Sequence, residues 1–202
     1  MVRYRLVVVF LLSLFLTGCG YNTLQAEDEA MSAAWSEVLN QYQRRADLVP
    51  NLVNTVKGYA AHEERVFTQV TDARAQVGRL QWDAATAADE KKINEFIAAQ
   101  KTMSSALSRL LVVSENYPQL KADVNFRDLQ AQLEGTENRI TLARKRYIDA
   151  VRHYNTDVRS FPTNVTAMIF GLKPRPNFTV ENEPALRVAP PVDFSSGVKQ
   201  KE

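Results

Sequence analysis

The chain has 202 residues, of which 45% are hydrophobic and 24% are charged, as is typical of one globular domain with short additions. Two of its 25 basic residues, Arg3 and Arg5, lie in a segment that we expect to be removed, which leaves 23 basic against 23 acidic residues. A neutral protein without a basic patch is not expected to bind nucleic acid. Only seven glycines, in a chain rich in Ala, Leu, Gln, Arg and Glu, favour an all-α fold.

Residues 1–18 are predicted to be a signal peptide of the lipoprotein type. A basic start precedes an apolar run over residues 6–16, which is well short of the roughly 20 residues needed to span a bilayer. Leu16-Thr17-Gly18-Cys19 resembles a bacterial lipobox, and Cys19 is the only cysteine. We therefore expect Cys19 to carry a lipid anchor, since several acyl chains on one residue hold a protein stably at a membrane. The alternative is an uncleaved membrane helix that ends near Tyr21.

Residues 19–27 are predicted to form a tether, and residues 28–171 a bundle of long helices. In the first helical part, apolar residues recur every three or four positions, as on one face of a helix. They are Met31, Trp35, Val38, Tyr42, Val49, Leu52, Val56, Tyr59, Phe67, Val70, Ala73 and Val77. Pro50 interrupts this part, because proline inside a helix removes a hydrogen bond. The pattern predicts either a kink near Ala46 or a new helix with Asp47 as its N-cap.

Two further long helices follow a turn predicted at residues 78–85. Thr86 with Asp89 resembles a capping box for the second, and Asn125 with Asp128 resembles one for the third. The third carries the most regular apolar stripe, in which spacings of four and three alternate as in the seam of a bundle. Its members are Leu129, Leu133, Thr136, Ile140, Ala143, Tyr147, Ala150, Tyr154 and Val158. Long helices joined by short turns bury such stripes most simply as an antiparallel up-down bundle, here of three to four helices.

Phe161-Pro162 is predicted to end the third long helix. Residues 163–170 then suit a short fourth helix that Gly171 would cap. Residues 172–202 contain several prolines without helical periodicity, and we expect them to form an extended or disordered tail.

Six segments follow one another along the chain: Gly20 to Gln25 (GYNTLQ), Asn40 to Val53 (NQYQRRADLVPNLV), Thr55 to Ala60 (TVKGYA), Tyr154-Asn155, Phe161 to Asn164 and Phe170-Gly171. Together these segments resemble the LemA family. The resemblance implies a bacterial, membrane-anchored protein whose helical bundle faces away from the cytoplasm, and it implies no enzyme activity. The lipobox is a departure, because other members keep a plain membrane helix; this leaves the anchoring chemistry open.

One stretch holds more polar residues than a plain helix needs. The candidate site comprises Arg44, Arg45, Asp47, Asn51, Asn54 and Lys57. Polar residues inside a bundle can fix helix register and pairing. Alternatively, Arg44 and Arg45 could donate hydrogen bonds to the carboxylates of a partner. Trp82, in the predicted turn, is either an exposed interface residue or a lid over one end of the bundle.

No residue pattern indicates catalysis, and we expect neither a metal nor a cofactor. His62 lacks a second histidine at the spacing of a metalloprotease helix. An antiparallel pairing could bring His62 near His153, with Glu63 or Glu64 adjacent, but two solvated histidines are the favoured interpretation. No pair of carboxylates stands out beside an apolar pocket, as acid–base catalysis would require.

The favoured function is a membrane-anchored scaffold or adaptor of the cell envelope, without catalytic activity and with a protein partner in the envelope. The alternative is a periplasmic module that binds a small molecule, a peptide or a cell-wall fragment where the kink opens the bundle; an enzyme is less favoured. Gly20 follows Cys19 in place of the aspartate expected in lipoproteins held at the inner membrane. The periplasmic face of the outer membrane is therefore expected if the cell has two membranes.

Overall fold

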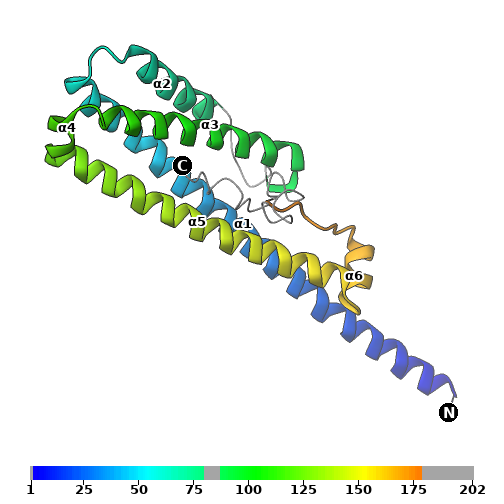
Figure 1. The fold of residues 1–202 in the computed structure, drawn as a ribbon. Coiled ribbons are helices and arrows are strands. Elements are labelled where there is room, and N and C mark those ends of the chain that lie inside the picture. The colour runs from blue at the N-terminus through cyan, green and yellow to red at the C-terminus, as the bar shows by residue number, and fades with distance from the viewer. Residues whose placement is uncertain (1, 80–86, 179–202) are drawn as a thin grey trace, which may run out of the picture.

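The computed structural model describes residues 2–79 and 87–178, with side chains at Arg3 and from Gly20 onward. These residues form six α-helices and no strand, which confirms the predicted all-α class (Figure 1). The helices are α1 (Val2–Tyr59), α2 (Glu64–Arg79), α3 (Glu90–Ser114), α4 (Pro118–Ala122), α5 (Val124–Arg159) and α6 (Thr163–Phe170). Within the described part of the chain, none of these helices combines the length and the apolar character needed to cross a membrane.

The two longest helices, α1 and α5, lie side by side and run in opposite directions (Figure 1). The Trp35 ring lies 5.1 Å from the ring of Tyr147. Towards the other end, the Tyr59 hydroxyl donates to the Asp123 carboxylate at 2.8 Å. Because the residue number rises along α1 as it falls along α5, the pair is antiparallel. Helices α2 and α3 form a second pair against the C-terminal half of α1, and α6 packs on its N-terminal half (Figure 1).

The core consists of two apolar clusters separated by a polar layer. The first cluster centres on Trp35 and draws on α1, α3, α5, α6 and the segment after α6. The second centres on Leu110 and draws on α1 to α5. Between them lie three buried polar residues, Arg45 of α1, Gln100 of α3 and Thr136 of α5. We call these three residues the polar layer; apart from it, the buried faces follow the helical period that the sequence predicts.

Helix α1 continues through Pro50, so the predicted helix start at Asp47 is wrong. Pro50 has no N–H to donate to the carbonyl of Ala46 four residues earlier. That carbonyl accepts a hydrogen bond of 3.1 Å from Nε of Arg74 on α2 instead. A partner from another helix therefore compensates for the proline, which sequence periodicity cannot reveal.

Three predicted boundaries also differ from the structure. Residues 20–27 continue α1 and form no separate tether. Asp89 is itself the N-cap of α3 and accepts from the backbone N–H groups at positions 91 and 92, while Thr86 lies outside the described residues. Asp123, and not Asn125, caps α5 and accepts from the N–H of Phe126 at 2.9 Å.

The end of the described chain is ordered by packing. Gly171 ends α6 in the left-handed conformation, at φ 68°, as predicted. Residues 172–178 carry no helix or strand and lie against α1 and α5, and the rest of the predicted tail lies outside the described residues. Phe178 is buried in the first cluster, beside the rings of Trp35 and Tyr147.

Candidate functional site

Arg45 is the most elaborately bonded residue of the predicted site. Its side chain is 2% exposed and reaches from α1 to both α3 and α5. Nη1 donates to Ser104 Oγ at 2.9 Å and to Glu137 Oε1 at 2.8 Å. Nη2 donates to Gln100, at 3.2 Å to the carbonyl and at 2.5 Å to Oε1. Arg45 therefore joins three helices at the polar layer.

The electrostatics of this layer indicate a structural role. A guanidinium stays charged, and burying it is costly unless partners surround it. Cζ of Arg45 lies over the Tyr42 ring, 4.9 Å from its centroid, as in a cation–π interaction. Burial is the main cause that raises the pKa of Tyr42. Glu137 keeps 45% of its side chain exposed, so its carboxylate retains much of its hydration. Because these bonds form only when α1, α3 and α5 stand at one height, Arg45 can fix their register.

The other five residues of the predicted site are exposed. Arg44, Asp47, Asn51 and Asn54 follow one another at intervals of three or four along α1, with Lys57 a further three positions on. This spacing places them along one face of the helix. Within the described part of the chain, no side-chain hydrogen bond links them to another helix, and Asp47 accepts only from Gln43, at 2.8 Å. We call these five residues the α1 polar stripe.

The structure thus separates two neighbours that the sequence analysis treated alike. Arg44 faces solvent, whereas Arg45 lies in the polar layer. The side chains of two other predicted residues lie outside what the structure describes. The backbone of Cys19 lies in α1, but its side chain is outside what the structure describes, and Trp82 lies outside the described residues altogether.

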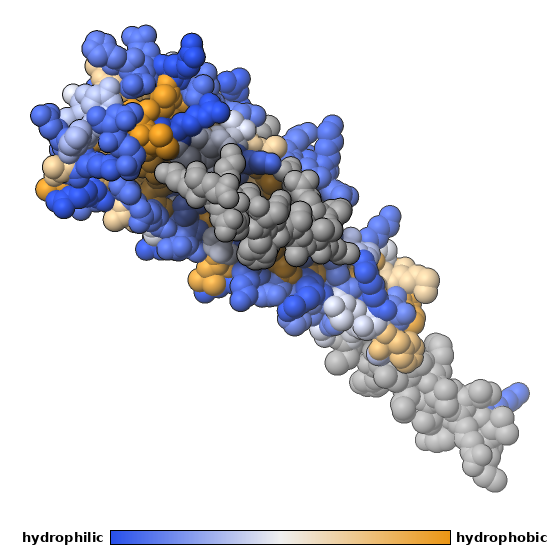
Figure 2. Space-filling model, in the orientation of Figure 1, coloured by the Kyte–Doolittle hydropathy of each residue, from blue (hydrophilic) through white to orange (hydrophobic). Residues whose placement is uncertain are grey.

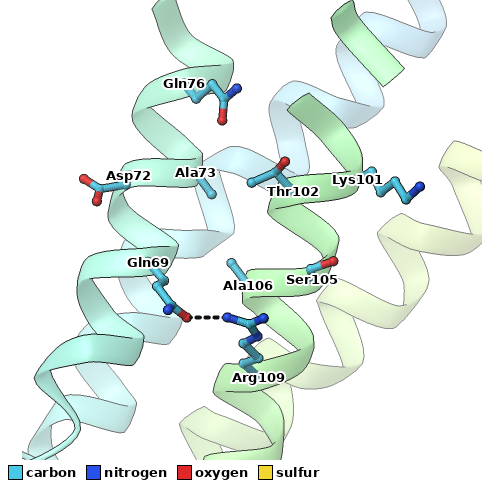
Figure 3. Close-up of a pocket in the computed structure, with 9 residues that line it drawn as sticks. All are labelled: Gln69, Asp72, Ala73, Gln76, Lys101, Thr102, Ser105, Ala106 and Arg109. Atoms are coloured by element: carbon cyan, nitrogen blue, oxygen red, sulfur yellow. Dashed lines mark hydrogen bonds between the residues drawn. The ribbon is translucent and has the colours of Figure 1, made fainter. Parts of the chain in front are cut away.

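A shallow groove runs between α2 and α3 (Figure 3). It has a volume of about 510 Å³. Its lining residues are Gln69, Asp72, Ala73, Gln76, Lys101, Thr102, Ser105, Ala106 and Arg109. A hydrogen bond of 2.9 Å from Arg109 Nη1 to Gln69 Oε1 crosses it at one end (Figure 3). The groove therefore leaves room for a ligand between α2 and α3.

The two histidines do not meet. His62 follows the end of α1, where Tyr59 bonds to Asp123, the N-cap of α5. His153 lies 30 residues further along α5, which is about 45 Å of helix. The pairing considered from the sequence is therefore not formed, and no group of three potential metal ligands occurs among the described residues.

One well-bonded site was missed by the sequence analysis. The Asn155 amide donates to the carbonyl of Arg175 at 2.8 Å, and its oxygen accepts from the N–H of Arg175 at 2.7 Å. The Arg175 guanidinium pairs with Asp28 of α1 at 3.0 Å. Together these bonds hold residues 172–178 across α1 and α5 and bring Phe178 into the core. The only signal in the sequence was the Tyr154-Asn155 pair of the family resemblance.

The family can now be assigned. A model of the LemA family matches residues 34–194. The chain belongs to the LemA family. The match begins just before Trp35, so it includes the polar layer, the α1 polar stripe and all of α2 to α6.

The LemA chain is also similar to magnetosome proteins of two organisms. The magnetosome proteins MamQ 1 and MamQ 2 of Paramagnetospirillum magneticum are each 26% identical to it over 189 residues. The magnetosome protein MamQ of Magnetospirillum gryphiswaldense is 22% identical over 189 residues. Each match covers 83% of this chain and 66% of the relative, so the chain spans just under two thirds of these relatives' length.

In this LemA chain, the two segments that carry the resemblance most clearly have different structural roles. The first, in α1, contributes Arg45 to the polar layer and Pro50 to the turn that Arg74 supports. The second, at the end of α5, contributes the buried Tyr154 and the bonded Asn155. Neither segment forms a catalytic constellation among the described residues, and both position helices.

Proposed function

We propose that this LemA protein is a membrane-anchored scaffold or adaptor of the cell envelope that works without catalysis. Family membership and the similarity to magnetosome proteins support a membrane-associated protein without catalytic activity. We propose further that the helices act as one antiparallel up-down bundle. The anchor would be a lipid on Cys19 or, alternatively, the apolar segment over residues 6–16, with the bundle on the non-cytoplasmic side.

The observation that carries this proposal is the continuity of α1. Helix α1 runs without a break from the expected anchor, whether Cys19 or the apolar segment before it, to the polar layer and the α1 polar stripe. An anchor that is helical up to the body holds the stripe at a defined height above a membrane, whereas a flexible tether would not. The arrangement suits a protein that presents one face to a partner in the envelope.

The α1 polar stripe is the proposed partner surface. Arg44 and Lys57 offer donors for carboxylates, and Asn51 and Asn54 offer both donors and acceptors. Arg45 holds α1 against α3 and α5 from the opposite side of the helix, so the stripe is supported by a fixed backbone. Such support lowers the entropy that a partner must overcome on binding.

Photo-crosslinking in the producing cell tests this proposal. A photoreactive amino acid replaces Asn51 in the stripe or, as the matched control, the exposed Asn138 of α5. We expect a small set of envelope proteins to be captured from position 51 only, and to be lost when Cys19→Ala removes the lipid site. Equal capture from both positions, or none from either in a folded and abundant protein, would argue against an adaptor that uses this face.

A second candidate function, a binding module for a small molecule, a peptide or a cell-wall fragment, rests on the groove between α2 and α3. Seven of its nine lining residues have polar side chains, which offer hydrogen-bond partners to a peptide or a wall fragment. Muropeptides and short peptides should raise the melting temperature if they bind the folded state. A rise in the melting temperature that Arg109→Ala abolishes would favour this function. An unchanged melting temperature with all of these ligands would argue against it.

A further inference from the structure

More than half of the exposed large apolar side chains in the described part of the chain lie in one short segment. Of the nine large hydrophobic residues that are exposed in the described part of the chain, five lie between residues 161 and 170. They are Phe161, Val165, Met168, Ile169 and Phe170. Figure 2 shows apolar side chains over α6, at the end of the molecule from which the N-terminal part of α1 emerges. We call these five residues the α6 apolar patch.

Helix α6 exposes its large apolar residues and buries its small or polar ones, the reverse of the usual arrangement in a surface helix of a globular protein. Its buried residues are Thr166 and Ala167, which are polar or small. Its exposed face carries Met168 and Ile169, of which Ile169 is 65% exposed, and Phe161 just before the helix is 82% exposed. A surface helix normally buries its large apolar residues, so this inversion indicates a face that meets an apolar surface.

Close packing fixes the position of α6 on α1. A Cβ atom at Gly20 would lie 2.9 Å from Thr163 Cγ2 and 3.2 Å from Thr166 Oγ1, so only glycine fits here without movement. On the next residue, the Tyr21 ring lies 4.6 Å from the ring of Phe170. The α6 apolar patch is therefore held beside residues 20 and 21 of α1, directly after Cys19.

The place of α6 along α1 coincides with the expected membrane surface. If Cys19 is lipidated, its acyl chains leave the protein one residue before Gly20. If the apolar segment over residues 6–16 is the anchor, it joins the rest of α1 through the same helical turn, at residues 19–21. Both modes of anchoring place the headgroup region at the level of residues 19–21, where the α6 apolar patch lies.

We propose that α6 docks on the lipid bilayer through the α6 apolar patch. This inference rests on the proposed membrane anchoring and adds a second membrane contact to it. An anchor at one point leaves a rod free to tilt, whereas a patch inserted beside the anchor fixes its orientation. The inserted side chains reach the boundary between headgroups and acyl chains, as those of interfacial helices do.

Quenching by brominated lipids tests the depth of α6. The full-length protein is placed in phosphatidylcholine vesicles with or without bromine on the acyl chains, and vesicle flotation is measured in parallel. The probe is the indole added by Ile169→Trp. The control is Val112→Trp in α3, because Val112 is also 65% exposed but lies near α4, at the end of the molecule away from α6 (Figure 1). The fluorescence of Trp35 and Trp82, measured in the unmodified protein, is subtracted.

We expect the bromine to lower the fluorescence of the Ile169→Trp indole about two-fold and to leave that of Val112→Trp unchanged, because interfacial helices reach acyl-chain depth. Protein that floats with the vesicles while neither indole is quenched would overturn the docking and leave the anchor intact. A dimer in the vesicles that Ile169→Asp dissociates would also overturn it, in favour of a second copy on this face. Protein that does not float would refute the anchoring and the docking together.

Discussion

Nε of Arg74 on α2 donates a hydrogen bond of 3.1 Å to the carbonyl oxygen of Ala46 on α1. This carbonyl lies four residues before Pro50, which has no N–H with which to bond it. The bond therefore supplies from a second helix what the proline removes from the first. It also ties α2 to α1.

The first prediction concerns this pair. Arg74→Met should lower the free energy of unfolding by about 1 kcal/mol, because a partly buried carbonyl loses its partner. In a Pro50→Ala background the same change should cost less than half as much, since the alanine N–H can bond Ala46. Urea unfolding of the unmodified protein, the two single variants and the double variant gives the coupling between the two positions. Arg65→Met, at an exposed position near the start of α2, is the control, and equal costs in both backgrounds would refute the coupling.

The second prediction concerns the polar layer. Gln100→Leu removes the oxygen that lies 2.5 Å from Arg45 Nη2, and Arg45→Met leaves the buried Gln100 amide without its partner. Each single change should cost about 2–3 kcal/mol, because each removes one partner of a buried hydrogen bond to a charged group. The double variant should lie within about 1 kcal/mol of the unmodified protein, since apolar residues of similar size can replace a buried polar pair. If calorimetry instead shows that the double variant loses the sum of the two single losses in unfolding free energy, the two residues act separately.

The third prediction is a pH dependence at Glu27. Burial is the main cause that raises the pKa of Glu27, the neighbouring Asp157 carboxylate raises it further, and His153 partly offsets the rise. A carboxyl with a raised pKa in the folded state favours folding while it is protonated, and this contribution is lost as the pH rises through that pKa. Glu27→Gln should therefore stabilise the protein at pH 7 and have little effect near pH 4. Melting temperatures across this range measure the difference.

Glu29→Gln provides the control for the pH experiment. It removes one carboxylate from an exposed position two residues further along α1. If the melting temperatures of Glu27→Gln and Glu29→Gln change with pH in the same way, the burial of Glu27 is not the cause of the pH dependence.

The fourth prediction compares two glycines of long helices. Gly135→Ala in α5 should raise the free energy of unfolding by about 0.5–1 kcal/mol, because alanine is the better helix former and no atom outside the helix lies within 4 Å of the new Cβ. Gly20→Ala gains the same propensity but places its Cβ 2.9 Å from Thr163 Cγ2. It should therefore loosen α6, which hydrogen exchange at the amides of residues 163–170 would detect. Unchanged exchange would show that α6 does not depend on this close approach.

Several features of the fold could be predicted because they depend on local periodicity. Seven of the nine stripe positions expected in the third long helix are buried in α5; the exceptions are Leu129 and Ala150, which are partly exposed. The left-handed Gly171 was predictable for a similar reason, since glycine adopts this conformation at little cost. Family membership was also recognisable, because a long ordered run of residue identities is a property of the sequence itself.

The candidate site could be predicted only in part. The sequence marked the stretch that holds Arg44 and Arg45 as unusually polar, but adjacent residues of a helix point about 100° apart. Which of the two enters the core depends on where α3 and α5 lie around α1. Asn155 and Phe178 were overlooked because their partners, Arg175 and Trp35, lie 20 and 143 residues away along the chain.

The sequence by itself therefore determined the all-α class, the apolar faces of the helices and the family, since each depends on residues within a few turns of one another. Tertiary structure alone decided that α1 runs through Pro50, that Arg45 and not Arg44 is buried, and that α6 turns its apolar face outward beside Gly20. The physical reason is the same in each case. A hydrogen bond from Arg74, a polar layer shared by three helices, and a glycine at a helix crossing are contacts between distant segments, which no local pattern encodes.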